Sequence, residues 1–222
     1  MKRIMLILLG TVLMMSAFAQ YGTRRYPTRP ATSGHFSQPR TYSDIYYGLR
    51  LGVAFATVNS DDKYLDGGSS KTGLDVGAVV GFQLGYHSPM YFETGLRYIE
   101  KGGKGKYEGA KFTYSLDYLE LPLVLKYWYD IDNSFSVQPF LGGYLALGVG
   151  GKIKDFGQRQ AYSSFDNEGF QRFDGGIKLG CGVQYDLIYA ELGYDIGLAN
   201  ISHDYFDTSH TGSLFLAVGV NF

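Results

Sequence analysis

The most constraining feature of this sequence is a strict alternation of side-chain character that continues to its last residue. The final stretch reads GSLFLAVGVNF, and every second residue counted back from the end is large and apolar, whereas those between are mostly small or polar. Successive side chains of a β-strand point to opposite faces, so a period of two predicts a strand with two unlike faces. The apolar positions are Leu214, Leu216, Val218, Val220 and Phe222.

The same alternation recurs along the chain from Asp44 onward. It marks eight segments, each long enough for a tilted strand that crosses a membrane. The part of the fourth segment that precedes Tyr118 is out of phase with the rest, which predicts a β-bulge near Tyr118. The segments centre on residues 47–55, 74–84, 92–98, 119–127, 137–149, 173–183, 188–196 and 214–222.

The connections between the segments differ in length. Three are tight turns rich in turn-forming residues, and four are longer. Short turns on one side and long loops on the other are typical of an antiparallel meander. We therefore predict an all-β fold, an eight-stranded antiparallel up-and-down transmembrane β-barrel over residues 44–222. The tight turns are HSPM, DIDN and Asp186-Leu187, and the loops lie at about 59–71, 102–111, 151–172 and 200–210.

The volume of the lumen decides which face of the strands points outward. An up-and-down barrel is either soluble, with its apolar face inward, or inserted in a membrane, with that face outward. The lumen of an eight-stranded barrel is just wide enough for side chains to fill, so it cannot hold about forty large apolar groups. The opposite face, rich in glycine and other small residues, fits inside. A soluble lipocalin-like barrel stays the alternative fold.

Charged residues also lie on the face that is predicted to point inward. Their positive and negative groups are nearly balanced, as desolvated charges require. We interpret them as a salt-bridged plug that fixes the strand register, and a gated narrow pore is the alternative interpretation. The predicted lumen charge network consists of Arg50, Asp75, Glu93, Arg97, Glu120, Lys126, Asp174, Lys178, Glu191 and Asp195.

Aromatic residues gather beside the tight turns and the ends of the barrel sequence. Aromatic side chains are enriched where a membrane meets water, so we predict that these residues form one ring at one interface. The expected ring contains Tyr47, Tyr86, Tyr127, Tyr129, Tyr185 and Phe222, together with Tyr46, Tyr91, Trp128 and Phe135.

The N-terminus has the three parts of a secretory signal peptide. Lys2 and Arg3 precede an apolar run from Ile4 to Met15, and SAFAQ then supplies a cleavage site of the A-x-A type. We predict that residues 1–19 are the signal peptide. Residues 20–43 are polar, contain several arginines and prolines, and are predicted to form a flexible periplasmic tail.

The net charge and the cysteine content argue against a nucleic-acid-binding protein and against a disulfide-stabilised fold. Two of the 20 basic residues lie in the signal peptide, which leaves 18 against 21 acidic residues and a net charge of −3. This balance provides no electrostatic footprint for nucleic acid. A single cysteine, Cys181, excludes an internal disulfide framework.

Four stretches carry a family resemblance: YYGLRLGVAF (46–55), YFETGLRYIEKG (91–102), YLELPLVLKYWY (118–129) and QPFLGGYLALGVGG (138–151). In these stretches and in its layout, the chain resembles the small outer-membrane barrels of the OmpA/OmpX type. It resembles still more closely the PorT-like "outer membrane protein beta-barrel domain" group. The alternating apolar residues that end in Phe222 are similar to the signal that outer-membrane proteins present to the barrel-insertion machinery.

The resemblance implies residence in the outer membrane of a Gram-negative bacterium and contact with its lipids and lipopolysaccharide. We expect a non-enzymatic barrel, without cofactor or metal, whose long extracellular loops bind an unidentified ligand or support the envelope. A PorT-like accessory role in a secretion apparatus, acting through the tail at 20–43, is the first alternative.

An outer-membrane protease or lipid A-modifying enzyme is the second alternative. A histidine beside a carboxylate serves as a general base, and two of each hold a metal. The candidates are His203, Asp204, Asp207 and His210, with Asp61 and Asp62 as further members. KGGKGK at 101–106 is interpreted as a solvated hairpin tip, with contact to lipopolysaccharide phosphates as its alternative.

Overall fold

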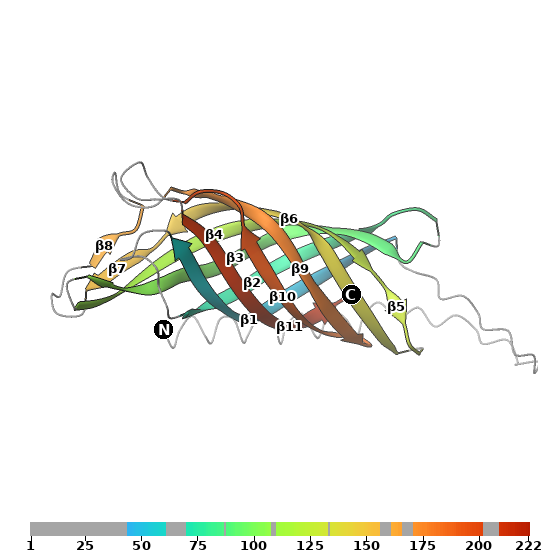
Figure 1. Cartoon of the computed structure of the whole chain (residues 1–222). Helices are drawn as coiled ribbons and strands as arrows, with labels where there is room; N and C mark the ends of the chain where they lie inside the picture. Colours follow the sequence, from blue (N-terminus) through green and yellow to red (C-terminus); the bar gives the residue numbers. More distant parts are fainter. Residues whose placement is uncertain are drawn as a thin grey trace, which may run out of the picture. The chain divides into compact units, whose positions relative to one another are not determined.

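The computed structural model describes residues 44–60, 70–86, 88–107, 110–132, 134–155, 161–165, 171–201 and 209–222. The predicted signal peptide and tail lie outside these residues and stay predictions. Within the described residues, every regular element is a β-strand (Figure 1). No helix in this part of the chain is long and apolar enough to cross a membrane.

In the described part of the chain, eleven strands form one antiparallel sheet, and eight of them close into a barrel. In ring order the barrel strands are β1 (Ile45–Ser60), β2 (Lys71–Gln83), β3 (Met90–Tyr107), β4 (Ala110–Tyr127), β6 (Phe135–Gly150), β9 (Phe173–Tyr185), β10 (Ile188–Gly197) and β11 (Ser209–Asn221). Three short strands extend the sheet, namely β5 (Tyr129–Asp130), β7 (Lys152–Asp155) and β8 (Ala161–Ser163).

The ring closes because the last strand pairs with the first. β11 lies antiparallel to β1 from Gly48↔Asn221 to Ser60↔Ser209, so each of the eight strands has a neighbour on both sides. An open edge would leave backbone N–H and C=O groups unsatisfied in lipid, which closure avoids. The predicted eight-stranded antiparallel barrel is confirmed.

The register shifts between β4 and β6, where the sequence predicts a bulge. Asp117 pairs with Gly150 and Tyr118 with Gly148, so β6 carries the extra residue. The bulge near Tyr118 is confirmed, but the reason inferred for it, a change of phase in β4, is wrong. β4 keeps its phase, because Tyr114 is fully buried like Tyr118. The apolar residues ahead of the bulge therefore pack in the lumen.

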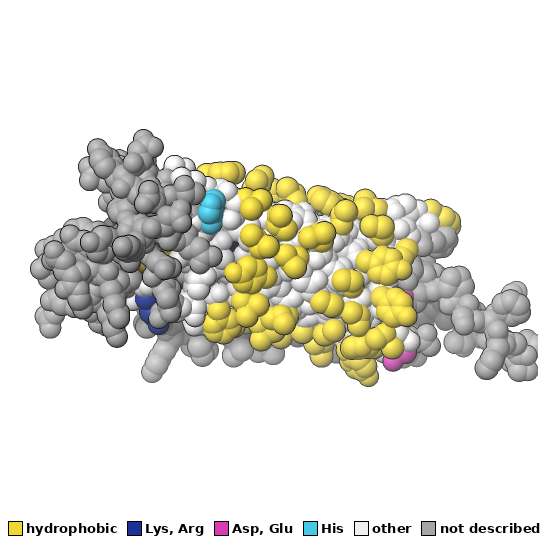
Figure 2. Space-filling model, in the orientation of Figure 1, with side chains coloured by type: hydrophobic (Ala, Val, Ile, Leu, Met, Phe, Trp, Pro, Cys, Tyr) yellow, Lys and Arg dark blue, Asp and Glu magenta, His cyan; other side chains and the backbone are white. Residues whose placement is uncertain are grey.

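Large apolar side chains cover the outer face of the barrel (Figure 2). On β9 they extend from Phe173 to Tyr185, which are 53% and 61% exposed. About 12 residues at about 3.3 Å each, tilted by about 45°, span about 28 Å across a bilayer. The hydrocarbon core of a bilayer is about 30 Å thick. The prediction that the apolar face points outward is confirmed.

The two ends of the barrel differ. We call the end with the three tight turns, which follow β2, β5 and β9, the turn end, and we call the opposite end the loop end. At the loop end, the loop predicted at 102–111 is instead the continuation of β3 and β4, which pair as far as Tyr107↔Ala110. Its glycines conceal the alternation, but main-chain pairing needs no side-chain pattern. The loop predicted at 151–172 contains β7 and β8, so a sheet of β3, β4, β7 and β8 extends from the loop end (Figure 1).

An arginine in the middle of the outer apolar face is expected to destabilise the barrel. Leu216 of β11 is 48% exposed and pairs with Val53 and Leu192. Leu216→Arg should lower the free energy of unfolding in phospholipid vesicles by about 2–4 kcal/mol, because the charge enters hydrocarbon. Leu84→Arg, at the turn end, is the control and should cost less than about 1 kcal/mol. Urea titration measures both, and equal costs would contradict the placement of the apolar face in lipid.

Candidate functional site

The barrel lumen contains the charged residues that the sequence assigns to the inward face. Inward positions recur at every second residue of a strand, so the alternation that exposes the apolar side chains buries the charged ones. The structure places all ten predicted residues inside the barrel, each at most 3% exposed: Arg50, Asp75, Glu93, Arg97, Glu120, Lys126, Asp174, Lys178, Glu191 and Asp195.

Their ion pairs form two clusters. The turn-side cluster consists of Arg50, Asp75, Glu93, Arg97, Lys126 and Glu191. The loop-side cluster consists of Lys101, Glu120, Asp174, Lys178 and Asp195. The first has three cations and three carboxylates, and the second has two cations and three carboxylates. Burial without such pairing would carry a large desolvation cost, so the pairing is what allows these charges inside.

Glu93 is the centre of the turn-side cluster. Its carboxylate accepts hydrogen bonds from the Tyr46 hydroxyl at 2.5 Å and from Lys126 Nζ at 2.7 Å. Arg50 Nη2 lies 3.5 Å from the same oxygen. The Arg50 guanidinium also lies 4.0 Å from the centre of the Tyr189 ring. β1, β3, β4 and β10 are therefore joined around one carboxylate.

Arg97 connects two strands that are not neighbours in the ring. Its guanidinium donates to both oxygens of Asp75 on β2, at 3.1 and 2.5 Å, and to Glu191 Oε1 on β10 at 2.8 Å. The planar guanidinium suits this bidentate contact with a carboxylate. Tyr189 completes the connection, since its hydroxyl accepts from Lys126 at 2.9 Å and donates to Glu191 at 3.0 Å.

Two lysines hold the three carboxylates of the loop-side cluster. Lys178 Nζ lies 2.6 Å from Asp195 and 2.9 Å from Glu120. Lys101 Nζ lies 3.2 Å from Asp174 and 3.7 Å from Glu120. Glu120 on β4 thus interacts with a lysine from β3 and with another from β9.

Hydroxyl groups from the remaining strands complete the network. Tyr144 on β6 donates to Asp174 at 3.3 Å, and Thr211 on β11 donates to the same carboxylate at 2.9 Å. With these two residues, each of the eight barrel strands contributes at least one polar side chain to the lumen network. Its interactions therefore link the whole circumference of the barrel.

Lys101 is the lumen charge that sequence reasoning missed. The hairpin-tip interpretation of 101–106 is wrong at this residue, because Lys101 is fully buried and paired. The signal was present in the spacing: Glu93, Arg97 and Lys101 are four residues apart and therefore share one face of a strand. The glycines after Lys101 interrupt the alternation, so the pattern predicts that the strand ends too early.

An aromatic pair lies between the two clusters. The rings of Phe140 and Phe215 stack with their centroids 6.4 Å apart. Arg97 and Lys178 lie 4.9 and 4.1 Å from the centre of the Phe215 ring, distances that allow cation–π attraction. Gly193 makes room for this ring, because an added Cβ would meet it. The middle of the lumen is filled as a result.

Tyr46 and Tyr91 lie inside the barrel, so their assignment to the interfacial ring is wrong. They are 3% and 0% exposed, and their rings lie 5.4 and 4.8 Å from that of Trp128. Tyr46 alternates with the outward-facing Tyr47 and therefore lies on the inward face, and proximity to a turn does not report on which face a side chain occupies. The three rings cover the turn end of the lumen.

Apolar side chains cover the loop end of the lumen. Phe165, which follows β8, is 8% exposed, and its ring lies 5.8 Å from that of Tyr118 in an edge-on arrangement. The adjacent Ser164 hydroxyl donates to the Ser115 carbonyl at 2.7 Å and anchors this segment. Ile201 is fully buried in the same apolar cluster.

The six main residues of the predicted interfacial ring are exposed at 45–91% of their surface. They are Tyr47, Tyr86, Tyr127, Tyr129, Tyr185 and Phe222. Exposure is what contact with lipid headgroups requires, and the ring itself stays a prediction.

The residues of the catalytic alternative fall largely outside the described part of the chain. Those outside are Asp61, Asp62, His203, Asp204 and Asp207. His210 is described, and its Nδ1 lies 3.2 Å from the carbonyl oxygen of Ala199. Among the residues that the structure describes, no group of three or more His, Cys, Asp or Glu is arranged to hold a metal ion.

Loss of Arg97 is expected to destabilise the barrel strongly. Arg97→Met leaves Asp75 and Glu191 buried without their shared cation, which should lower the free energy of unfolding by about 3–5 kcal/mol. Asp44→Asn, at an exposed carboxylate of the turn end, is the matched control and should change it by less than about 0.5 kcal/mol. Urea titration in detergent gives both values. A double variant, Arg97→Met with Asp75→Asn, should recover part of the loss, and equal stability of Arg97→Met and wild type would contradict the role given to this pair.

Solved structures of small outer-membrane proteins resemble the chain at low sequence identity. Ail of Yersinia pestis is 15% identical, with a TM-score of 0.43 over 81% of this chain and 100% of that one. The Neisserial surface protein A is 20% identical, with a TM-score of 0.40 over 81% and 96%. OprG of Pseudomonas aeruginosa is 12% identical, with a TM-score of 0.43 over 81% and 96%. No curated protein sequence matches the chain.

The family comparison covers most of the chain. The model of the outer membrane protein beta-barrel domain matches residues 18–203, from before the first barrel strand to beyond β10. This range includes every charged residue of the two lumen clusters. The chain therefore belongs to the outer membrane protein beta-barrel domain family, and it resides in the outer membrane of a Gram-negative bacterium.

Proposed function

We propose that the protein is a non-enzymatic, non-conducting barrel that holds its extracellular segments in place for binding. The observation that carries this proposal is the filled lumen, in which ion pairs connect strands from different sides of the ring. Arg97 joins β3 to β10, and Lys101 joins β3 to β9. Such pairs brace the wall, and they occupy the space that a pore would need.

The loop end provides the support for binding. Bacterial outer-membrane barrels have short periplasmic turns and longer extracellular loops, so the loop end faces outward from the cell. There, β3 and β4 continue as a paired hairpin, and β7 and β8 add to the same sheet. A sheet continuous with the barrel wall limits the motion of the segments that it carries, and loops on a rigid scaffold are common sites of recognition.

The wild-type barrel is expected to show no steady ion conductance in planar lipid bilayers. Phe165→Ala removes a side chain that covers the loop end, but it leaves both charge clusters and the Phe140–Phe215 pair below it in place. This variant should therefore also be silent. Single-channel recording measures both proteins. Steady channel openings of the wild type would contradict the filled lumen. Channel openings of Phe165→Ala alone would show that the lumen is closed only at its loop end.

The enzymatic alternative has its own test. Lipid A extracted from cells that produce the wild type, or a variant with His203→Ala and His210→Ala, should have the same masses in both cases. The pattern of surface proteolysis should also be unchanged. A lipid A species or a cleavage product that disappears in the double variant would overturn the non-enzymatic assignment.

A further inference from the structure

Among the described side chains, the lumen contains one carboxylate more than it contains cations. The turn-side cluster is balanced, whereas two lysines face three carboxylates in the loop-side cluster. All five residues of the loop-side cluster are at most 1% exposed. A buried carboxylate without a counter-charge is costly, and such a group is neutralised instead. The loop-side cluster is therefore expected to bind one further positive charge.

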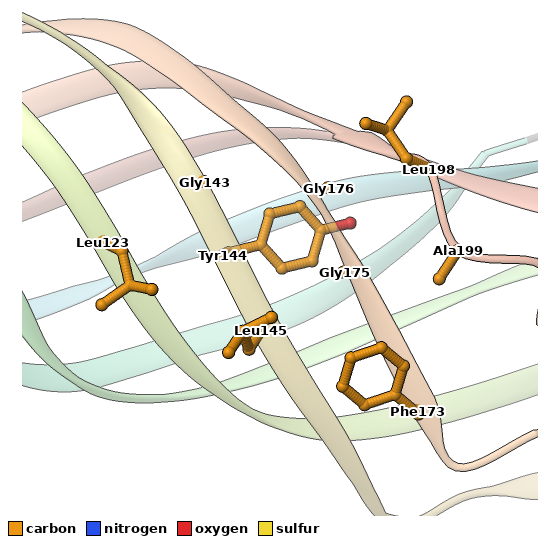
Figure 3. Close-up of a pocket in the computed structure, with 9 residues that line it drawn as sticks. All are labelled: Leu123, Gly143, Tyr144, Leu145, Phe173, Gly175, Gly176, Leu198 and Ala199. Carbon is orange, nitrogen blue, oxygen red and sulfur yellow. The ribbon is translucent and has the colours of Figure 1, made fainter.

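Asp174 is the carboxylate of this cluster that receives the most hydrogen bonds. One of its oxygens accepts from Lys101 Nζ at 3.2 Å and from the Thr211 hydroxyl at 2.9 Å, and the other accepts from Gly175 N at 2.8 Å. Figure 3 shows the Tyr144 side chain reaching from β6 toward β9 near Gly175, and its hydroxyl donates to Asp174 at 3.3 Å. A buried ionised carboxylate needs such donors at both oxygens. Asp174 therefore does not require the further charge.

Asp195 is the carboxylate with the least compensation. Its Oδ1 lies 2.6 Å from Lys178 Nζ, and the same nitrogen lies 2.9 Å from Glu120 Oε1, so two carboxylates share one ammonium group. Glu120 has a second cation, because Lys101 Nζ lies 3.7 Å from its Oε2. Asp195 Oδ2 is buried and accepts no hydrogen bond from a described residue.

A serine beside Asp195 also lacks a hydrogen-bond partner. Asp195 of β10 pairs directly with Lys178 of β9 on one side and with Ser213 of β11 on the other. Directly paired residues have Cβ atoms about 4.5–5.5 Å apart. The Ser213 hydroxyl is fully buried, and no described group forms a hydrogen bond with it. A hydroxyl oxygen can accept a hydrogen bond, so a protonated Asp195 has an acceptor next to it.

The surroundings of Asp195 favour a proton over a metal ion. The cluster already holds two ammonium groups, and a metal ion needs several oxygen ligands around it, whereas a proton needs one. The inward residue of β1 that pairs with Ser213 is the uncharged Ala56. Asp75 of β2 and Glu191 of β10 are both paired with Arg97. The other titratable groups around Asp195 come from β3, β4, β6 and β9, and they are Lys101, Tyr118, Glu120, Tyr144, Asp174 and Lys178.

We propose that the folded barrel binds one proton in the loop-side cluster and carries it on Asp195, at pH values where a water-exposed aspartate is ionised. The proton makes the described lumen neutral and leaves Lys178 to compensate Glu120. Its release at higher pH would leave a buried negative charge and weaken the barrel. This inference goes beyond the proposed function, because it concerns the barrel wall and does not depend on what the extracellular segments bind.

Infrared difference spectroscopy of the full-length barrel tests the proposal directly. The protein is kept at about pH 6, where exposed carboxylates are ionised, in an alkyl maltoside detergent that has no carbonyl group. The spectrum of wild type minus that of Asp195→Asn should show the C=O stretch of a protonated carboxylic acid, and this band should shift in deuterated water. Wild type minus Asp44→Asn, which removes an exposed carboxylate, is the control and should show carboxylate bands only.

The pH dependence of stability gives a second measurement. Asp195 of the unfolded chain is ionised above about pH 5, so unfolding releases the bound proton. As the pH rises, the unfolding equilibrium constant of wild type should increase relative to that of Asp195→Asn, by up to about tenfold per pH unit. This increase ends where the folded barrel also releases the proton. Urea titrations from about pH 5 to about pH 8 in the same detergent measure both proteins.

Three results would overturn the proposal. They are the absence of the carboxylic acid band from wild type, its persistence in Asp195→Asn, and equal pH dependence of the two proteins. If the band is absent and wild type is more stable in sodium than in choline at equal ionic strength, a metal cation occupies the site instead. Heat-dependent gel mobility first confirms that each variant is folded. Where Asp195→Asn does not fold, Glu120→Gln replaces it, because it also removes the excess carboxylate and should lose the band.

Discussion

Pairing of charge inside a narrow lumen is the constraint on which the rest of this structure depends. Eleven charged side chains are buried there, and each has an oppositely charged partner within 4.0 Å. A one-residue slip of any strand would move its charges to the lipid face and its apolar residues into the lumen. The ion pairs therefore fix the register of the strands. The apolar side chains of the outer face favour the same register, because they must face lipid.

Glycines on the inner and outer faces of the barrel wall make room for different groups. Inside, glycines such as Gly193 and Gly148 lie under the rings of Phe215 and Phe165, so the space they leave is occupied by the protein itself. Outside, an added Cβ at Gly143 or Gly175 would meet a backbone oxygen of the neighbouring strand at 3.3 Å, which is a tight contact. The same residue type therefore makes room for a side chain in one position and for a neighbouring backbone in another.

Much of the fold was predictable because alternation reports directly on the face of a strand. The eight strands, the outward apolar face and the inward position of residues such as Arg50 and Glu120 all follow from it. It fails where glycine interrupts the pattern, so it does not reveal Lys101 and predicts a loop where β3 and β4 form a hairpin. Which charges meet across the lumen, such as Arg97 and Glu191, depends on ring closure and stagger, which the local pattern does not contain.

The ion pairs that cross the lumen also bear on how the barrel enters its membrane. Arg97 and Glu191 are separated by 94 positions in the chain, and Lys101 and Asp174 by 73. An incomplete barrel that holds β1 to β4 but not β9 and β10 would keep the Arg97–Asp75 and Lys101–Glu120 pairs, but its four buried cations would face only three carboxylates, at a desolvation cost. The full set of ion pairs therefore forms only when the late strands join. The order of synthesis and the order of insertion are uncoupled for this wall, which favours crossing of the hydrocarbon as a nearly complete ring.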